Sequence, residues 1–272
     1  MERCPSDREV SKMTDVTRYA PPDTHSAVSA AGAVVPHAPV LLPEVNPAAV
    51  KAARPYLAAI GSLDWGPAQV VVVVSPHGAR TGVYERVAGS LDDFGVRDMG
   101  GEWPTATEEL AGLARSWGSD VLEGPIDHGV FVPLALGCAH GLPVIAVALA
   151  EGPHSLSGGP FGYAEKLAQA VSGLGASAVF IASAHTSAAL SPRAPVTGLV
   201  LARATEQEAL ESLRGDAGSL CTTVGKLLTL GGTCSAGSLT AFGHRFGGRT
   251  TDVLAYGCPF GVGYLVASVG AS

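Results

Sequence analysis

Several stretches of the chain are mainly apolar and do not alternate with polar residues. They cover residues 32–35, 69–75, 143–149 and 176–183. Strands of this kind are buried on both faces, as in a sheet that is covered by helices. Further strands are predicted at residues 83–90, 252–256 and 263–269.

The segments between these strands carry helix signals. Asn46 before Pro47 is typical of a helix start and predicts a helix to about residue 60. Thr105 and Glu108 have the spacing of a capping box and predict a helix to about residue 117. Other helices are expected at residues 130–139, 163–172, 206–213 and 219–230. Because strands alternate with helices, the sequence predicts an α/β fold, a three-layer sandwich with one mostly parallel or mixed central sheet and helices on both faces.

The first thirty residues differ in composition from the rest of the chain. Residues 1–30 are polar and contain Pro21-Pro22, so we expect a flexible leader there. No linker rich in Gly, Pro and Ser follows, which predicts a single domain over residues 31–272. Hydrophobic residues make up 47% of the chain and charged residues 15%. That composition offers ample apolar surface for a core and excludes disorder as the main state.

Charge and apolar patterning exclude several partners. The 17 basic and 24 acidic residues give a net charge of −7, and there is no basic run of the kind that nucleic-acid binding needs. No apolar stretch approaches the roughly 18 residues of a membrane helix, and no signal-peptide core is present. The five cysteines are widely spaced without a C-x-x-C motif, which argues against a disulfide framework. We therefore expect a cytoplasmic protein with no nucleic-acid or membrane partner.

Histidines follow three of the predicted buried strands. His37, His77 and His185 each come directly after one, and His128 precedes a predicted helix. If the strands are parallel neighbours, the three imidazoles converge on one crevice, where α/β sheets bind ligands. Imidazole is a common metal ligand and acid/base group. The simpler alternative for each histidine is a hydrogen-bonded surface or loop residue. For Asp127-His128 the alternative is that Asp127 caps the following helix and leaves His128 exposed.

Four motifs occur in order along the chain. They are Pro36-His37-Ala38-Pro39-Val40-Leu41-Leu42-Pro43-Glu44-Val45, then Ser75-Pro76-His77-Gly78, then Asp127-His128-Gly129 with Val132-Pro133-Leu134, and finally Gly257-Cys258-Pro259-Phe260-Gly261-Val262-Gly263-Tyr264. Together they resemble the class III extradiol ring-cleaving dioxygenases, the relatives of the protocatechuate 4,5-dioxygenase β subunit that also include the Memo-like proteins. The resemblance spans about residues 32–269.

The resemblance implies a non-haem Fe(II) ion held by two histidines and a carboxylate. His37 and His77 match the two histidines, and His128 matches a histidine with an acid/base or substrate-contact part. Such a centre leaves positions open for O₂ and for both hydroxyls of a catechol. The implied function is ring cleavage of a small catechol-like aromatic substrate with O₂, and the alternative is a Memo-like metal-binding protein without that activity. Whether the chain forms a homo-oligomer stays open.

Two positions depart from the ring-cleaving pattern. Where the family often carries its catalytic base, an ungapped match places Ala188, so we expect His185 to take that part. No Glu stands at the position of the third ligand, and Cys221 matches the cysteine of the Memo-like proteins. A thiolate there would shift metal preference from iron toward Cu(I) or Zn. The alternative for Cys221 is a buried thiol on a helix face, and Glu211 and Asp216 are further candidates for the ligand.

Overall fold

The computed structural model describes residues 28–150 and 162–270. One central mixed sheet has the strand order β10-β11-β1-β9-β3-β8-β4-β7, with β2 paired to β1. Its strands are β1 Val28–Val35, β2 Leu63–Asp64, β3 Val70–Gly78, β4 Gly82–Tyr84, β7 Asp120–Leu122, β8 Val144–Ala150, β9 Ala178–Ser183, β10 Asp252–Gly257 and β11 Tyr264–Gly270. A separate two-stranded sheet pairs β5 Ala88–Ser90 with β6 Gly100–Glu102.

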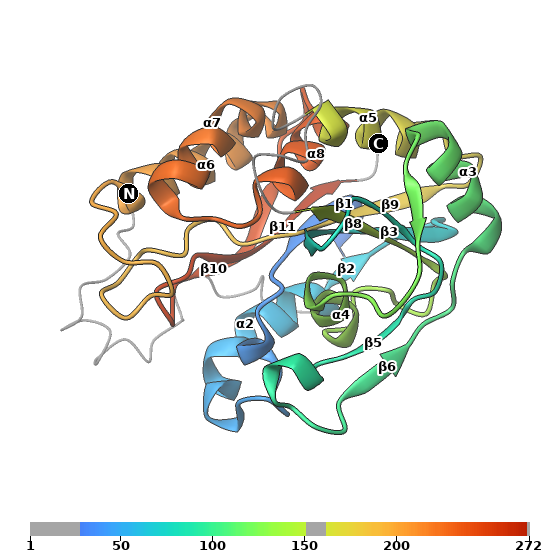
Figure 1. The fold of residues 1–272 in the computed structure, drawn as a ribbon. Coiled ribbons are helices and arrows are strands. Elements are labelled where there is room, and N and C mark those ends of the chain that lie inside the picture. Colours follow the sequence, from blue (N-terminus) through green and yellow to red (C-terminus); the bar gives the residue numbers. More distant parts are fainter. Residues whose placement is uncertain (1–27, 151–161, 271–272) are drawn as a thin grey trace.

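Helices cover both faces of the central sheet (Figure 1). On one face lie α2 Val50–Gly61 and α4 His128–Ala135. On the other lie α3 Thr107–Trp117, α5 Gly162–Ser172, α6 Ala202–Gly215, α7 Leu220–Lys226 and α8 Ala236–Phe246. Short helical turns are η2 Pro39–Leu41, η3 Pro47–Ala49, η4 Asp92–Phe94, η5 Ala217–Ser219 and the π-type η6 Leu227–Gly231. The predicted three-layer α/β sandwich is confirmed.

The valine run of β3 shows why its sequence lacks alternation. Val71 and Val73 pack into the core on the α2/α4 face, whereas Val70, Val72 and Val74 pack into the core on the α5–α8 face. Both sets are almost completely buried. A strand that is covered on both sides needs apolar residues at every position.

Four adjacent central strands run parallel, in the order β1, β9, β3 and β8. At one edge, β11 is antiparallel to β1 and β10 is antiparallel to β11. At the other edge, β4 is antiparallel to β8. The parallel block brings the carboxyl ends of four strands to the same edge of the sheet, where ligands bind in folds of this class.

Several local predictions were wrong. The expected capping box does not form, because Thr105 Oγ1 accepts a hydrogen bond from Val87 N–H at 3.2 Å and α3 begins only at Thr107. Asn46 makes no side-chain cap. The single strand expected at 83–90 is two strands, β4 and β5, which belong to different sheets.

Other observed elements also differ from the predicted ones. The last three residues of the expected leader, 28–30, belong to β1, and residues 1–27 lie outside the described part of the chain. Helix α8 was not predicted, because its glycines and serines favoured a turn. Within the described residues, no helix combines the length and the apolar character that a bilayer crossing requires.

Candidate metal centre

The register of three parallel strands brings His37, His77 and His185 to one place. Val34 of β1 pairs with Ala182 of β9, and Ala182 also pairs with Val74 of β3. In each strand the histidine lies three residues beyond this row. The predicted convergence of the three imidazoles is confirmed, and its cause is a shared register at the carboxyl edge of the sheet.

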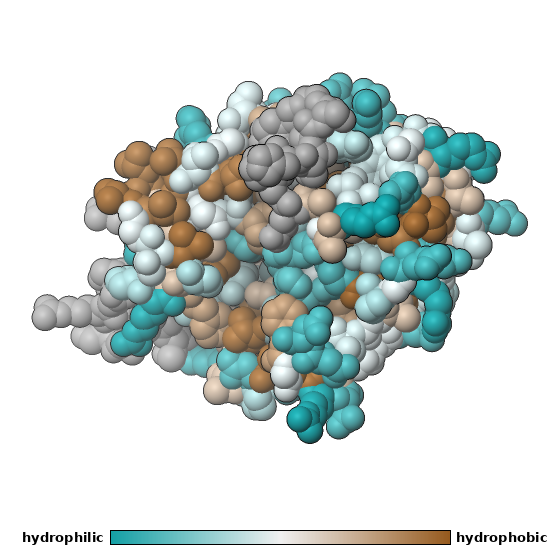
Figure 2. Space-filling model, in the orientation of Figure 1, coloured by the Kyte–Doolittle hydropathy of each residue, from teal (hydrophilic) through white to brown (hydrophobic). Residues whose placement is uncertain are grey.

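The imidazoles are in direct contact. His37 Nε2 lies 3.1 Å from His77 Nε2, and the ring centroids of His37 and His185 are 5.2 Å apart. His128 lies beside them, with its ring centroid 4.1 Å from that of His77 and an interplanar angle of 32°. His37 is 3% exposed. In the view shared by Figures 1 and 2, a recessed zone at the middle of the face is hydrophilic.

A thiol completes the cluster. Cys234 Sγ lies 3.3 Å from His77 Nε2 and 3.5 Å from His37 Nε2. It is also 3.7 Å from His185 Nδ1. Among the described residues, His37, His77 and Cys234 form the one group whose ligand atoms lie close enough together to hold a metal ion.

The loop that carries Cys234 is fixed by its two neighbours. Thr233 Oγ1 donates to the His185 carbonyl at 2.9 Å, and His185 N–H donates to Ser235 Oγ at 3.0 Å. The C=O and N–H groups of His185 are therefore both hydrogen-bonded to the residues that flank Cys234. Ser238 Oγ adds a bond to the Ser183 carbonyl at 2.8 Å, which anchors the start of α8 to the end of β9. These bonds set the position of the thiol relative to His185.

Asp127 fixes His128 at the start of α4. Its Oδ1 accepts hydrogen bonds from Gly129 N–H at 2.7 Å and from Ser75 Oγ at 2.5 Å, and its Oδ2 accepts from Tyr84 Oη at 2.9 Å. Asp127 thus caps the helix as the alternative predicted, but His128 is not exposed, because it packs against His77. A Cβ at Gly129 would lie 2.2 Å from Ser75 Oγ, so this close approach requires glycine.

Burial favours the neutral form of three of these imidazoles, His37, His128 and His185. It lowers the pKa of His37 well below the usual value, and His185, His77 and His128 add to the shift because charged rings would repel one another. Burial and the nearby His77 also lower the pKa of His128 and of His185 to about 4 each. A neutral ring retains a lone pair, which is what metal ligation or proton acceptance needs.

The donor set fits a transition-metal ion. Metal–nitrogen bonds near 2.0 Å and metal–sulfur bonds near 2.3 Å in a tetrahedral site place two nitrogens about 3.3 Å apart and a nitrogen and a sulfur about 3.5 Å apart. The corresponding distances among His37, His77 and Cys234 are 3.1, 3.3 and 3.5 Å. Two imidazoles and one thiol are ligands for zinc, copper or iron.

The prediction that Cys221 is the third ligand was wrong. Cys221 lies on α7 and faces α8, where its Sγ is 3.8 Å from the Thr240 carbonyl oxygen. The structure does not place Cys221 with the histidines. As in the alternative interpretation, it is a thiol on a helix face, although it is half-buried and not fully buried. The cysteine that lies with the histidines is Cys234, which sequence reasoning missed. No local signal marked Cys234, because the helix that follows it, α8, was not predicted.

The other candidates have local structural roles. Asp216 Oδ1 accepts from the backbone N–H groups of Gly218 and Gly248. Glu211 is exposed and accepts from Gln207 Nε2 at 3.1 Å. In the described part of the chain, neither carboxylate belongs to the histidine cluster.

Comparison with known proteins shows the fold and no more. No family model matches the sequence, and no curated protein matches it. Among solved structures, the chain is similar to the uncharacterized protein JW3007 from Escherichia coli K12, with a TM-score of 0.57 and 15% sequence identity. The match covers 88% of this chain and 99% of that chain. At this identity the similarity concerns the fold alone.

Proposed function

We propose that this protein is a metal-dependent dioxygenase of the extradiol type, which cleaves a catechol-like aromatic ring with O₂. The observation that carries the proposal is the cluster of four histidines and one cysteine at the carboxyl edge of the parallel strands. Iron, the metal used by the ring-cleaving enzymes that the motifs resemble, is the first metal to test, with copper and zinc as alternatives.

In this proposal three side chains hold the ion and two others move protons. His37, His77 and Cys234 are the ligands, because their donor atoms lie within 4.8 Å of one another. The bound ion would supply coordination positions for O₂ and for both hydroxyls of the substrate. Neutral His128 and His185 stand beside these ligands and can accept a hydroxyl proton and return it to the product.

The surroundings of the cluster favour a flat aromatic substrate. Phe94 contacts the edge of His128, with ring centroids 4.8 Å apart, and is half exposed. The ring of Phe94 can therefore cover the plane of a bound catechol at the outer side of the site. Ring cleavage inserts both oxygen atoms of O₂ into the product, so no separate reductant is required.

The test is a reconstitution experiment. Protein stripped with a chelator is loaded without oxygen with Fe(II), Cu(I) or Zn(II), then mixed with a series of catechols and O₂. We expect Fe(II)-loaded protein to consume O₂ and to form a yellow ring-fission product. His37→Ala and His77→Ala are expected to abolish the product, and Cys221→Ser to leave it unchanged. Absence of product from every catechol with every metal would refute the proposal.

A second candidate is a Memo-like metal-binding protein of the same fold without ring cleavage. The presence of the Cys234 thiol in place of a carboxylate favours it, since thiolate prefers softer metals than Fe(II). This candidate predicts one tightly bound Zn(II) or Cu(I) ion per chain and no O₂ uptake with any catechol. Metal stoichiometry measured beside O₂ uptake therefore separates the two functions.

A further inference from the structure

A second recess lies at the opposite edge of the sheet from the histidines. It has a volume of about 310 Å³ and lies between the amino end of β9, the segment before β3, the end of α5 and the end of α8. The six residues of β9 separate this edge from the loop of His185, which corresponds to about 20 Å. We call this recess the Arg245 pocket, after the charged residue among those that line it.

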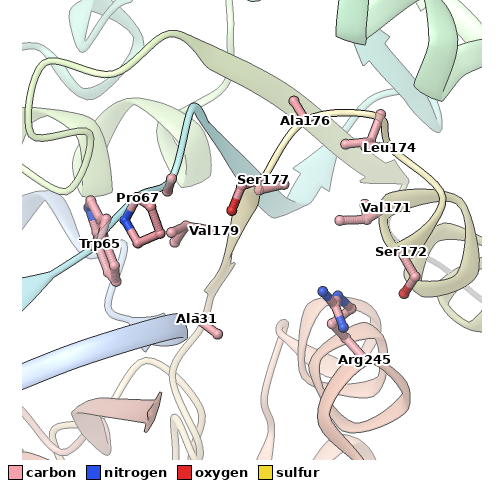
Figure 3. Close-up of a pocket in the computed structure, with 12 residues that line it drawn as sticks. Ala31, Trp65, Pro67, Val171, Ser172, Leu174, Ala176, Ser177, Val179 and Arg245 are labelled. Atoms are coloured by element: carbon pink, nitrogen blue, oxygen red, sulfur yellow. The ribbon is translucent and has the colours of Figure 1, made fainter. Parts of the chain in front are cut away.

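The walls of the Arg245 pocket combine apolar and polar surface. Trp65 and Pro67 line one side and Val171 and Leu174 line another, as Figure 3 shows. Trp65 is held in place because its Nε1 donates to the Cys138 carbonyl oxygen at 2.8 Å. The pocket thus offers fixed, flat apolar surface, and its volume lies in the range of small-molecule sites.

Arg245 brings a positive charge to this apolar surface. Its Nε is buried and has no hydrogen-bond partner, and no carboxylate within residues 28–150 and 162–270 forms an ion pair with it. Figure 3 shows its guanidinium group directed from α8 toward the pocket. The guanidinium carbon lies 5.1 Å from the centroid of the Phe246 ring, which supports the cation from one side only.

A second cation, Arg249, adds positive charge near Arg245. Arg249 lies over the same Phe246 ring, at 5.8 Å, and donates to the Gly270 carbonyl oxygen. Burial and the charge of Arg249 lower the pKa of Arg245, because both disfavour its charged form. A half-buried guanidinium whose Nε has no hydrogen-bond partner can gain charge-assisted hydrogen bonds from a bound carboxylate.

We propose that the Arg245 pocket binds a small organic acid, whose carboxylate pairs with Arg245 and whose flat apolar body lies against Trp65 and Pro67. Arginine suits this part because its planar group can bind a carboxylate through two parallel hydrogen bonds. The inference does not depend on the proposed function, since none of the pocket residues belongs to the histidine cluster.

The test compares an acid with its uncharged counterpart. Binding of 4-phenylbutyrate and of 4-phenyl-1-butanol to the full chain is measured by isothermal titration calorimetry. We expect the acid to bind at least tenfold more tightly than the alcohol, because only the acid can pair with Arg245. Equal affinities, or no binding of the acid at millimolar concentration, would overturn the proposal.

Variants locate the binding. Arg245→Met is expected to weaken acid binding at least tenfold, whereas Arg115→Met, at an exposed position on α3, should leave it unchanged. Arg245→Lys keeps the charge and should lose less affinity, so it provides the test if the Met variant does not fold. Chelator-treated Cys234→Ser protein should bind the acid as the wild type does. Loss of binding in that variant would place the acid at the histidine cluster instead and refute the pocket.

Discussion

Glu206 on α6 carries a carboxyl group that should govern how the stability of the protein depends on pH. The side chain is 3% exposed, and burial raises the pKa of Glu206 to about 7, although hydrogen bonds from Thr186, Tyr256 and the Ser187 backbone oppose the shift. Thr186 Oγ1 contacts both Glu206 Oε1 and the Gly263 carbonyl oxygen, the latter at 2.9 Å, but has one proton to give. A protonated Glu206 donates to Thr186 and leaves that proton for Gly263.

The sign and size of the effect follow from linkage. The folded state holds the Glu206 proton up to about pH 7, whereas the unfolded chain releases it near the ordinary value of 4.5. Stability from this group is therefore fully present below pH 4.5 and is lost as pH rises toward 7. A shift of this size corresponds to about 3 kcal/mol in the free energy of unfolding.

Glu206→Gln removes this dependence, because the Gln amide can donate to Thr186 as the protonated acid does. We expect the difference in unfolding free energy between variant and wild type to move in favour of the variant by about 2–3 kcal/mol from pH 5 to pH 8. The measurement is urea unfolding of chelator-treated protein at both pH values.

The matched control is Glu211→Gln, an exposed carboxylate on the same helix. It should change stability by less than about 0.5 kcal/mol at either pH. The lowered pKa values of His37, His128 and His185 act in the opposite direction, since they reduce stability as pH falls below 6.5. That contribution is common to wild type and variants and cancels in the difference. A difference between Glu206→Gln and wild type that stays constant from pH 5 to pH 8 would refute the reasoning.

Further predictions concern the metal centre and its support. Cys234→Ser should weaken Zn(II) binding at least tenfold and remove the thiolate-to-metal absorption of the Co(II)-loaded protein. Cys221→Ser should change neither property. The reverse result would assign the ligand to Cys221. Zn(II) at one hundred times its dissociation constant should raise the unfolding free energy of the wild type by about 3 kcal/mol, measured by urea unfolding with and without chelator. Asp127→Ala should lower the free energy of unfolding by about 2–4 kcal/mol in the same assay, because it removes a helix cap and leaves buried hydroxyl groups without their acceptor. A loss below about 0.5 kcal/mol would contradict that role. Gly129→Ala should cost about 1–3 kcal/mol, because its Cβ would collide with Ser75 Oγ, and an unchanged stability would show that Ser75 can move away.

The sequence by itself determined the layers of the fold and pointed to four of the five residues in the cluster, the histidines. The unbroken apolar runs required strands that are covered on both faces, and β3 and β9 follow them closely. Because parallel strands end at one edge, the positions of His37, His77 and His185 after such runs predicted their convergence. Periodicity and strand-end position are local features, and a sequence displays them directly.

Only the tertiary structure decided which thiol joins the histidines. Cys221 and Cys234 stand 13 residues apart in the chain, and local sequence does not distinguish them. The choice depends on two hydrogen bonds with the backbone of His185, about fifty residues away in the chain. Thr233 donates to its carbonyl oxygen, and Ser235 Oγ accepts from its N–H. The carboxyl of Glu206 and the guanidinium of Arg245 are likewise ordinary helix residues in the sequence. Their unusual environments arise because burial depends on packing between distant elements, which no local pattern records.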